Sequence, residues 1–189
     1  LTLYVHTAKA TKQVNLARTA LETAAKEDAA RPEVLLAVHE GYRLLGENPD
    51  AARAALEKAA ACAPSTLVGR LAVARAKALL GRVSEAERML TEELARSPKN
   101  ARVPLELGRF LALTGRRLQA IEQYRAAIRL DDRNLAWREA LAAVLHEAGL
   151  HDDCLTECKA ILDRSPANAT ALRLTNLILL ARGQEPLPQ

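Results

Sequence analysis

The feature that most constrains the fold is an internal repeat with a period of 34 residues. Two sets of turn residues keep this interval: the glycines Gly81, Gly115, Gly149 and Gly183, and the series Pro64, Pro98, Asp132 and Pro166. A unit of this length cannot bury its hydrophobic side chains alone. We therefore expect neighbouring copies to stack on one another and to share a continuous core.

Each copy is expected to contain two helices. The turn glycine supplies the left-handed conformation that ends the first helix, and proline or aspartate marks the end of the second. Five residues after each glycine stands a small side chain and four residues later a larger one, as in the pairs Ala86 and Leu90, Ala120 and Tyr124, Cys154 and Cys158. An earlier copy, which begins its turn at Gly46, has one inserted residue before Ala52 and Leu56. The small residue lets the two helices approach closely.

These residues resemble the tetratricopeptide repeat (TPR) family. With the turn glycine counted as position 15, the family places small or apolar residues at positions 7, 8 and 11, here Val38, His39, Tyr42; Val73, Ala74, Lys77; Leu107, Gly108, Leu111; and Leu141, Ala142, Leu145. Its alanine at position 20 matches Ala52, Ala86 and Ala120, with Cys154 in the last full copy. The departures lie mostly at position 4, usually tryptophan, which here is Leu35, Arg70, Pro104 and Arg138. The resemblance implies an all-α fold, a right-handed superhelical solenoid of antiparallel helix pairs.

The register divides a single TPR domain, 1–189, into repeats. Residues 1–31 are expected to form a degenerate first repeat, with Ala17, Leu21 and Ala24 in second-helix positions. The full repeats and the end of the array are then predicted at 32–66, 67–100, 101–134 and 135–168, followed by a terminal single helix at 169–182 and a tail at 183–189. This last helix is apolar on more than one face, whereas a terminal repeat normally presents a polar outer face. We expect another chain, or a continuation of this one, to cover it.

The stretch HDDCLTECKA raises the question of a metal site, because His151, Cys154 and Cys158 are spaced to share one face of a helix. A tetrahedral zinc would need a fourth ligand or a water, and His146 on the preceding helix is expected to point toward another face. Packing accounts for all three residues at their repeat positions, and free cysteine is often buried. We therefore predict a packed core with no metal.

No catalytic residues and no cofactors are predicted. The turns use most of the glycines, which leaves no phosphate-binding loop. The four histidines have no serine, cysteine or carboxylate at the spacing of a known catalytic motif. We therefore expect the chain not to be an enzyme, although a catalytic domain outside this segment would leave these residues unchanged.

The composition indicates whether the chain could span a membrane, which compartment it could occupy and whether it could bind nucleic acid. No run of 18 apolar residues is present, and the first ten residues are too short and polar for the core of a signal peptide. Three cysteines make no disulfide framework, so the cytoplasm and the periplasm both stay open. A charge of +4 and twenty arginines allow nucleic-acid binding as a minor alternative. Against it, only 3% of the residues are aromatic, and base stacking needs aromatic side chains.

The first helix of each repeat is expected to line a concave groove. If positions 4, 7, 8 and 11 face the core, positions 2, 5, 9 and 12 face the groove. The candidate partner-binding residues at these positions are Leu36, Glu40, Arg43, Leu71, Arg75, Arg102, Leu105, Arg109, Glu139 and His146. An exposed leucine stripe needs something to cover it, and arginine offers forked donors to carboxylates. The expected ligand is a peptide segment with apolar and acidic residues; the alternative is ordinary solvated arginines over a self-packed groove.

The sequence thus predicts a non-enzymatic scaffold for protein–protein interaction. The family resemblance suggests a bacterial multi-protein assembly, such as an envelope secretion or export machine. The main alternative is a structural module that self-assembles into homo-oligomers by stacking through the apolar helix at 169–182.

Overall fold

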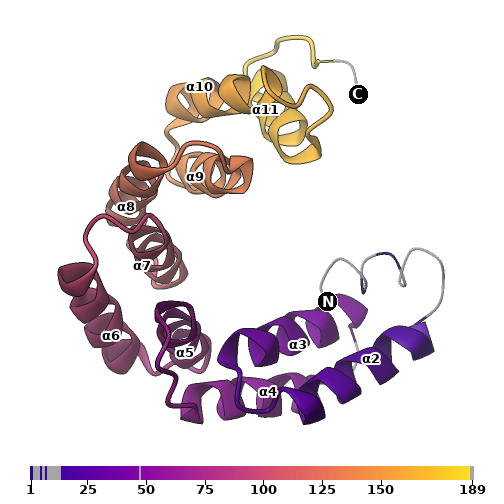
Figure 1. Ribbon diagram of the computed structural model, residues 1–189. Coiled ribbons are helices and arrows are strands. Elements are labelled where there is room, and N and C mark those ends of the chain that lie inside the picture. The colour runs from indigo at the N-terminus through magenta and orange to yellow at the C-terminus, as the bar shows by residue number, and fades with distance from the viewer. Residues whose placement is uncertain (2–4, 6, 8–13, 47, 188–189) are drawn as a thin grey trace. The chain divides into compact units, whose positions relative to one another are not determined.

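The computed structural model describes residues 1, 5, 7, 14–46 and 48–187. In these residues the ordered elements are α-helices, with no β-strand (Figure 1), which confirms the expected all-α fold class. The chain forms two compact units, Leu1–Glu93 and Leu94–Gln189. None of the helices in the described part of the chain has both the length and the hydrophobicity needed to cross a lipid bilayer.

The first unit contains five helices in its described residues. They are α2 (Val14–Glu27), α3 (Pro32–Leu45), α4 (Pro49–Ala61), α5 (Leu67–Leu79) and α6 (Val83–Arg96), of which α6 runs on past the boundary of the unit. The predicted intervals 32–66 and 67–100 each contain one helix pair. α2 supplies the second helix of the degenerate repeat and buries Ala17 and Leu21 completely, while most of the first half of that repeat lies outside the described residues.

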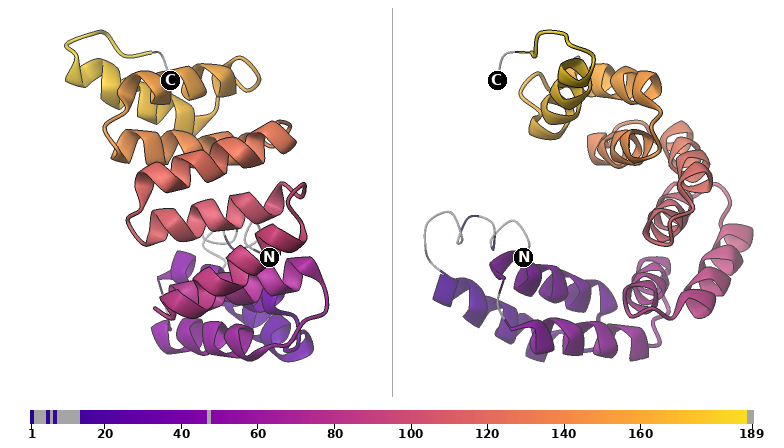
Figure 2. Two further views of the ribbon diagram at one scale, coloured as in Figure 1. Left: turned by 90° about the vertical axis from the view of Figure 1, so that its left-hand side faces the viewer. Right: turned by 180° about the vertical axis from the view of Figure 1, so that it is seen from behind.

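The second unit continues the same alternation. Its helices are α7 (Arg102–Leu113), α8 (Arg117–Leu130), α9 (Leu135–Glu147), α10 (His151–Leu162) and α11 (Ala169–Ala181). Helices that follow one another from α7 to α11 pack side by side (Figure 2). The intervals 101–134 and 135–168 each hold one pair, and α11 lies in the predicted terminal interval.

The turn glycines perform the predicted role. Gly46, Gly81, Gly115, Gly149 and Gly183 all have φ between +68° and +78°, a region that side chains with a Cβ rarely adopt. At Gly81, for example, its N–H binds the carbonyl of Ala78 and the N–H of Arg82 binds that of Lys77. These bonds satisfy carbonyl groups that the end of α5 would otherwise leave unpaired.

The predicted core positions within each pair are also confirmed. The small and large residues after each turn are all buried: Ala52, Leu56, Ala86, Leu90, Ala120, Tyr124, Cys154 and Cys158. The closest approach occurs at Gly108 on α7, where an added Cβ would lie 3.2 Å from ring atoms of Tyr124 on α8. A small residue at position 8 therefore sets the separation of the two helices.

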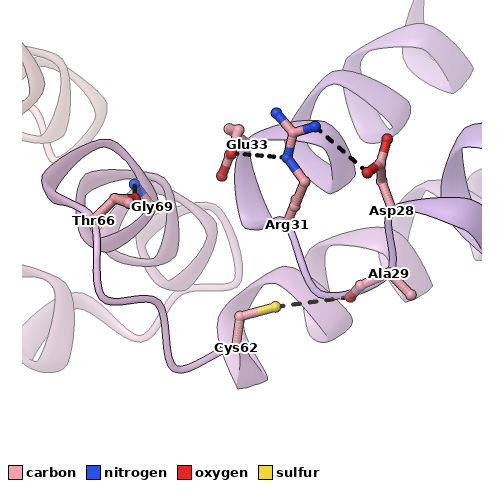
Figure 3. A network of polar contacts seen from close by, with 7 residues as sticks. All are labelled: Asp28, Ala29, Arg31, Glu33, Cys62, Thr66 and Gly69. Carbon is pink, nitrogen blue, oxygen red and sulfur yellow. Dashed lines mark hydrogen bonds and ion pairs between the residues drawn. The ribbon is translucent and has the colours of Figure 1, made fainter.

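Polar contacts fix the ends of the helices in the first unit (Figure 3). Between α2 and α3, Arg31 lies between Asp28 and Glu33, with N···O distances of 3.5 and 3.3 Å. At the start of α5, the hydroxyl of Thr66 accepts the N–H of Gly69 at 3.1 Å, the usual role of a threonine at a helix N-cap.

Candidate functional site

The first unit buries the leucines that were expected to line the groove. Leu36 on α3 and Leu71 on α5 are only 6% and 4% exposed. Leu36 belongs to a cluster with Ala72 and Ala76 of α5. Because these alanines let α3 and α5 pack closely, Leu36 is enclosed between these two first helices. The expected exposure of these leucines is therefore corrected.

An ion pair joins α3 and α5 at position 9. Nη2 of Arg75 lies 2.6 Å from Oε1 of Glu40, and both side chains are about one-third exposed. Arg75 was expected to offer its donors to a partner, and part of that capacity is already used within the chain. Arg43, at position 12, is exposed and forms no ion pair within the part of the chain that the structure describes.

Arg43 borders a hollow of about 320 Å³ at the end of this helix pair. Its lining is largely apolar and comes from the C-terminal parts of α3 and α5 and the first half of α4: His39, Arg43, Pro49, Ala52, Arg53, Leu56, Leu79 and Leu80. Nδ1 of His39 is bonded to the carbonyl oxygen of Ala52 at 2.9 Å, which holds the imidazole against α4. The hollow is thus an apolar recess with two guanidinium groups among its lining residues.

Sequence reasoning missed this hollow, although a signal was present. The turn before α4 is the one with an inserted residue, and it contains Asn48 in a left-handed conformation (φ 50°) followed by Pro49. The side chain of Asn48 accepts the N–H of Ala51 at 3.0 Å and so caps α4. An insertion that changes the entry into a second helix alters the space beside it, and Pro49 indeed lines the hollow.

The second unit also buries its groove leucine and pairs its groove arginine. Leu105 on α7 is 5% exposed. Nη1 of Arg109 lies 2.6 Å from Oε1 of Glu106, one turn earlier on the same helix. Arg102 is exposed and, with Lys99, Asn100 and Trp137 among others, lines a polar hollow of about 380 Å³.

The two remaining candidates lie on α9. Glu139 accepts a hydrogen bond of 2.9 Å from the side-chain amide of Asn168, the residue that caps α11. The His146 ring lies 5.5 Å from that of His151, between centroids, because the turn at Gly149 folds α10 back beside the end of α9. The expectation that His146 faces away from His151 is therefore wrong, and so is the burial of His151, which is exposed.

The cysteines confirm the predicted packing role. Cys154 and Cys158 are completely buried, and the thiol of Cys154 donates to the carbonyl oxygen of Ala142 on α9 at 3.3 Å. Hydrogen bonding to Cys158 and burial raise the pKa of the Cys154 thiol. Among the described residues, no group of three or more His, Cys, Asp or Glu side chains is placed to hold a metal ion.

Two of the four departures from the family pattern at position 4 are arginines that bind a glutamate. Arg70 on α5 forms two hydrogen bonds with Glu93 on α6, at 2.8 and 3.1 Å. Arg138 on α9 forms one with Glu157 on α10, at 2.8 Å. In both repeats the arginine joins the first helix to the second, where the family more often uses an aromatic side chain.

Solved structures with a similar fold are TPR proteins. The crystal structure of TTC0263, a thermophilic TPR protein of Thermus thermophilus, matches with a TM-score of 0.66 and 25% identity over 93% of this chain and 96% of that chain. A tetratricopeptide repeat protein from Parabacteroides merdae matches with a TM-score of 0.67 and 16% identity over 97% and 71%.

A larger assembly shows the same fold in part. The Cut9–Hcn1 structure, described as an APC/C hetero-tetramer, matches with a TM-score of 0.58 and 17% identity, and the match covers 93% of this chain and 35% of that chain. No protein-family model matches the sequence, and no curated protein matches it either. The repeat pattern, the helix pairs and these structural matches agree: the chain is a TPR-like helical-repeat protein.

Proposed function

We propose that this chain is a non-enzymatic scaffold for protein–protein interaction that binds a peptide segment with apolar and acidic residues. The TPR-like fold supports the general role, and one of the similar structures is that of a protein complex, Cut9–Hcn1. The first-helix residues Glu40, Arg43 and Arg75 supply the charged part of the surface in the first unit. In the second unit, Arg102, Arg109, Glu139 and His146 remain the candidate residues.

The observation that carries this proposal is the hollow beside Arg43. Because Leu36, Leu71 and Leu105 are buried, they cannot anchor a ligand, and the apolar recess bordered by Arg43 takes over that role. Its volume of about 320 Å³ accommodates a large apolar side chain. A carboxylate next to that side chain would pair with Arg43, whose guanidinium has no acidic partner in the described chain.

The two contributions differ in size. Burial of one leucine-sized side chain stabilises a complex by about 1.5–3 kcal/mol, whereas an exposed arginine–carboxylate pair adds at most about 1 kcal/mol. The recess therefore provides most of the affinity for the ligand, and Arg43 provides the preference for acidic segments. A segment anchored here alone would bind weakly, so the ligand also contacts other first-helix residues. A bacterial multi-protein assembly, such as an envelope secretion or export machine, is the proposed setting.

A displayed library of random peptides tests the proposal even when the natural partner has not been identified. The enriched sequences are expected to carry aspartate or glutamate next to a large apolar residue. A synthetic peptide with the enriched sequence should bind the Arg43→Glu variant about tenfold more weakly, because the substitution replaces attraction by repulsion. Fluorescence anisotropy with the labelled peptide measures this difference.

The matched control is Arg129→Glu, which makes the same charge change at an exposed residue in the last turn of α8. Circular dichroism should show equal helicity for both variants and the parent. Enrichment of basic peptides, or equal loss of affinity in the two variants, would reject Arg43 as the residue that pairs with an acidic ligand residue beside the recess.

A second candidate function is self-assembly through α11. Leu177 and Leu180 on this helix are 45% and 60% exposed. Contact of leucine side chains with water is unfavourable, and exposed apolar surface of this kind often marks a site that binds another chain. Light scattering over a hundredfold range of protein concentration tests it. A rise in mass that Leu180→Lys abolishes would support stacking, and a constant monomer mass would reject it.

A further inference from the structure

The chain after α11 turns back along that helix (Figure 2). Gly183, with φ +68°, makes the turn, and the N–H of Gln184 then binds the carbonyl of Leu179 at 2.9 Å. Residues 184–187 form no regular secondary structure. They return far enough for Leu187 to lie beside Asn176, eleven residues earlier in the chain.

Asn176 holds the backbone of Leu187 with both ends of its side-chain amide. Its Nδ2 donates to the carbonyl oxygen of Leu187 at 3.1 Å, and its Oδ1 accepts the N–H of Leu187 at 2.7 Å. In extended backbone the N–H and C=O of one residue point to the same side, so a single amide can bind both. This contact recognises an extended backbone and no particular side chain.

Asn176 stands at position 8, where earlier first helices face the second helix of their own repeat. His39 contacts the carbonyl of Ala52 on α4, and the carbonyl of Ala142 accepts the thiol of Cys154 on α10. Gly108 lies against the ring of Tyr124 on α8. By this equivalence, residues 184–187 lie on the face of α11 that a second helix would cover.

The tail sequence fixes the register of the contact. In Pro186-Leu187-Pro188 the two prolines lack an N–H, so Leu187 carries the one backbone donor of the three residues. A residue that precedes proline also favours extended backbone. Leu177 and Leu180, at positions 9 and 12 on the adjoining face of the same helix, are 45% and 60% exposed, so the tail leaves apolar surface beside Asn176 uncovered.

We propose that the face of α11 around Asn176 is a docking site for an extended, proline-flanked leucine segment of a partner protein, and that the tail occupies this site in cis. A longer partner segment displaces the tail because it forms the same two hydrogen bonds and also covers Leu177 and Leu180. This surface is separate from the recess at Arg43 and needs no acidic residue in its ligand. Its failure would therefore leave the proposed function in place.

Cis occupancy makes a quantitative prediction. A ligand that binds only when the tail is released has its affinity reduced by the fraction of molecules in the released state. Leu187→Pro removes the tail's N–H without shortening the chain, and so releases the site. This variant should bind a peptide with the tail sequence, GQEPLPQ, at least about fivefold more tightly than the parent.

The experiment is a titration of ¹⁵N-labelled full chain with this peptide, followed through the side-chain amide signal of Asn176. We expect a saturable shift in Leu187→Pro, both in this signal and in the backbone amide signals of α11. When Asn176→Leu is added, the backbone amide signals of α11 should no longer shift with the peptide. A peptide with N-methyl-leucine at the central position lacks the N–H donor and should bind about tenfold more weakly. Circular dichroism verifies that both variants keep the helicity of the parent.

Three results would overturn the proposal. One is the absence of a saturable shift in Leu187→Pro up to ~5 mM peptide. Another is equal affinity for the N-methylated peptide, which would mean that Asn176 does not bind the backbone. The third is a parent chain whose mass rises with concentration and falls back to monomer in Leu187→Pro, which would assign the site to the tail of a second copy.

Discussion

Each unit has an arginine at repeat position 4, and the two arginines form different contacts. In the first unit, Arg70 binds Glu93 through two hydrogen bonds and also donates to the carbonyl oxygen of Ser65, and the Glu93 side chain is 4% exposed. In the second unit, Arg138 makes one hydrogen bond to Glu157, a side chain that is 20% exposed. The acceptor also lies one helical turn earlier in the second helix of its repeat, at position 23 instead of 27.

We infer from this difference that burial of the acceptor, and not the identity of the arginine, decides how much each pair contributes to stability. The carboxylate of Glu93 is largely removed from water, so loss of its partner or of its charge leaves a costly group behind. The hydrogen bonds to Glu93 also raise the pKa of the Arg70 guanidinium. Arg138, by contrast, keeps a buried Nε without a partner in the described chain. Its pair is the weaker of the two.

The largest effect is expected for Glu93→Gln. The amide presents one acceptor in place of two and turns a donor toward Arg70, which should lower the free energy of unfolding by about 2 kcal/mol. This is below the cost of breaking a fully buried pair because Arg70 is about one-third exposed. Urea unfolding followed by circular dichroism measures the loss. Hydrogen exchange should place it in α5 and α6, and a loss spread equally over both units would contradict local action.

Glu157→Gln is expected to cost about half as much, roughly 1 kcal/mol, because a single hydrogen bond to a partly exposed carboxylate is lost. The same urea measurement applies, with exchange of α9 and α10 amides as the local readout. Equal losses for Glu93→Gln and Glu157→Gln would show that acceptor burial does not separate the two pairs.

The two pairs should also differ in how they tolerate an apolar replacement. Arg138→Leu in the Glu157→Gln background removes the unpartnered Nε, and stability should return to within about 0.5 kcal/mol of the parent. Arg70→Leu in the Glu93→Gln background should not recover in this way, because the carbonyl oxygen of Ser65 also loses its donor. The comparison of the two double variants by urea unfolding is the test, and equal recovery in both would contradict it.

The sequence predicted the helix pairs and the core because both follow from local rules. Turn glycines require positive φ, and the small and large residues after each turn, such as Ala120 and Tyr124, recur at fixed positions. It could not predict the arginine–glutamate pairs. Their acceptors occupy different repeat positions, so no periodic signal connects Arg70 to Glu93 and Arg138 to Glu157.

The candidate site was less predictable than the fold for a related reason. Assignment of positions 5, 9 and 12 to the groove treated each first helix as isolated, whereas Leu36 is enclosed by alanines of the next first helix. Exposure therefore depended on a neighbour 36 or more residues away in sequence. The predicted orientation of His146 was wrong for a different reason, since the turn at Gly149 brings its ring beside that of His151 on the next helix.

The smallest expected effect concerns the rate at which each cysteine is modified, which reports local opening of the two units and not their global stability. Cys62 in the first unit is partly exposed, whereas Cys154 and Cys158 in the second are completely buried. A thiol reagent should therefore modify Cys62 in the native chain, although slowly, because burial raises the pKa of its thiol. It should modify Cys154 and Cys158 only when α10 opens.

Glu157→Gln should lower the free energy of opening α10 by about 1 kcal/mol, so modification of Cys158 should become about fivefold faster. Glu93→Gln should leave the Cys158 rate unchanged if the two units open independently. An equal acceleration by both variants, measured by mass spectrometry of each cysteine, would show that the units open as one.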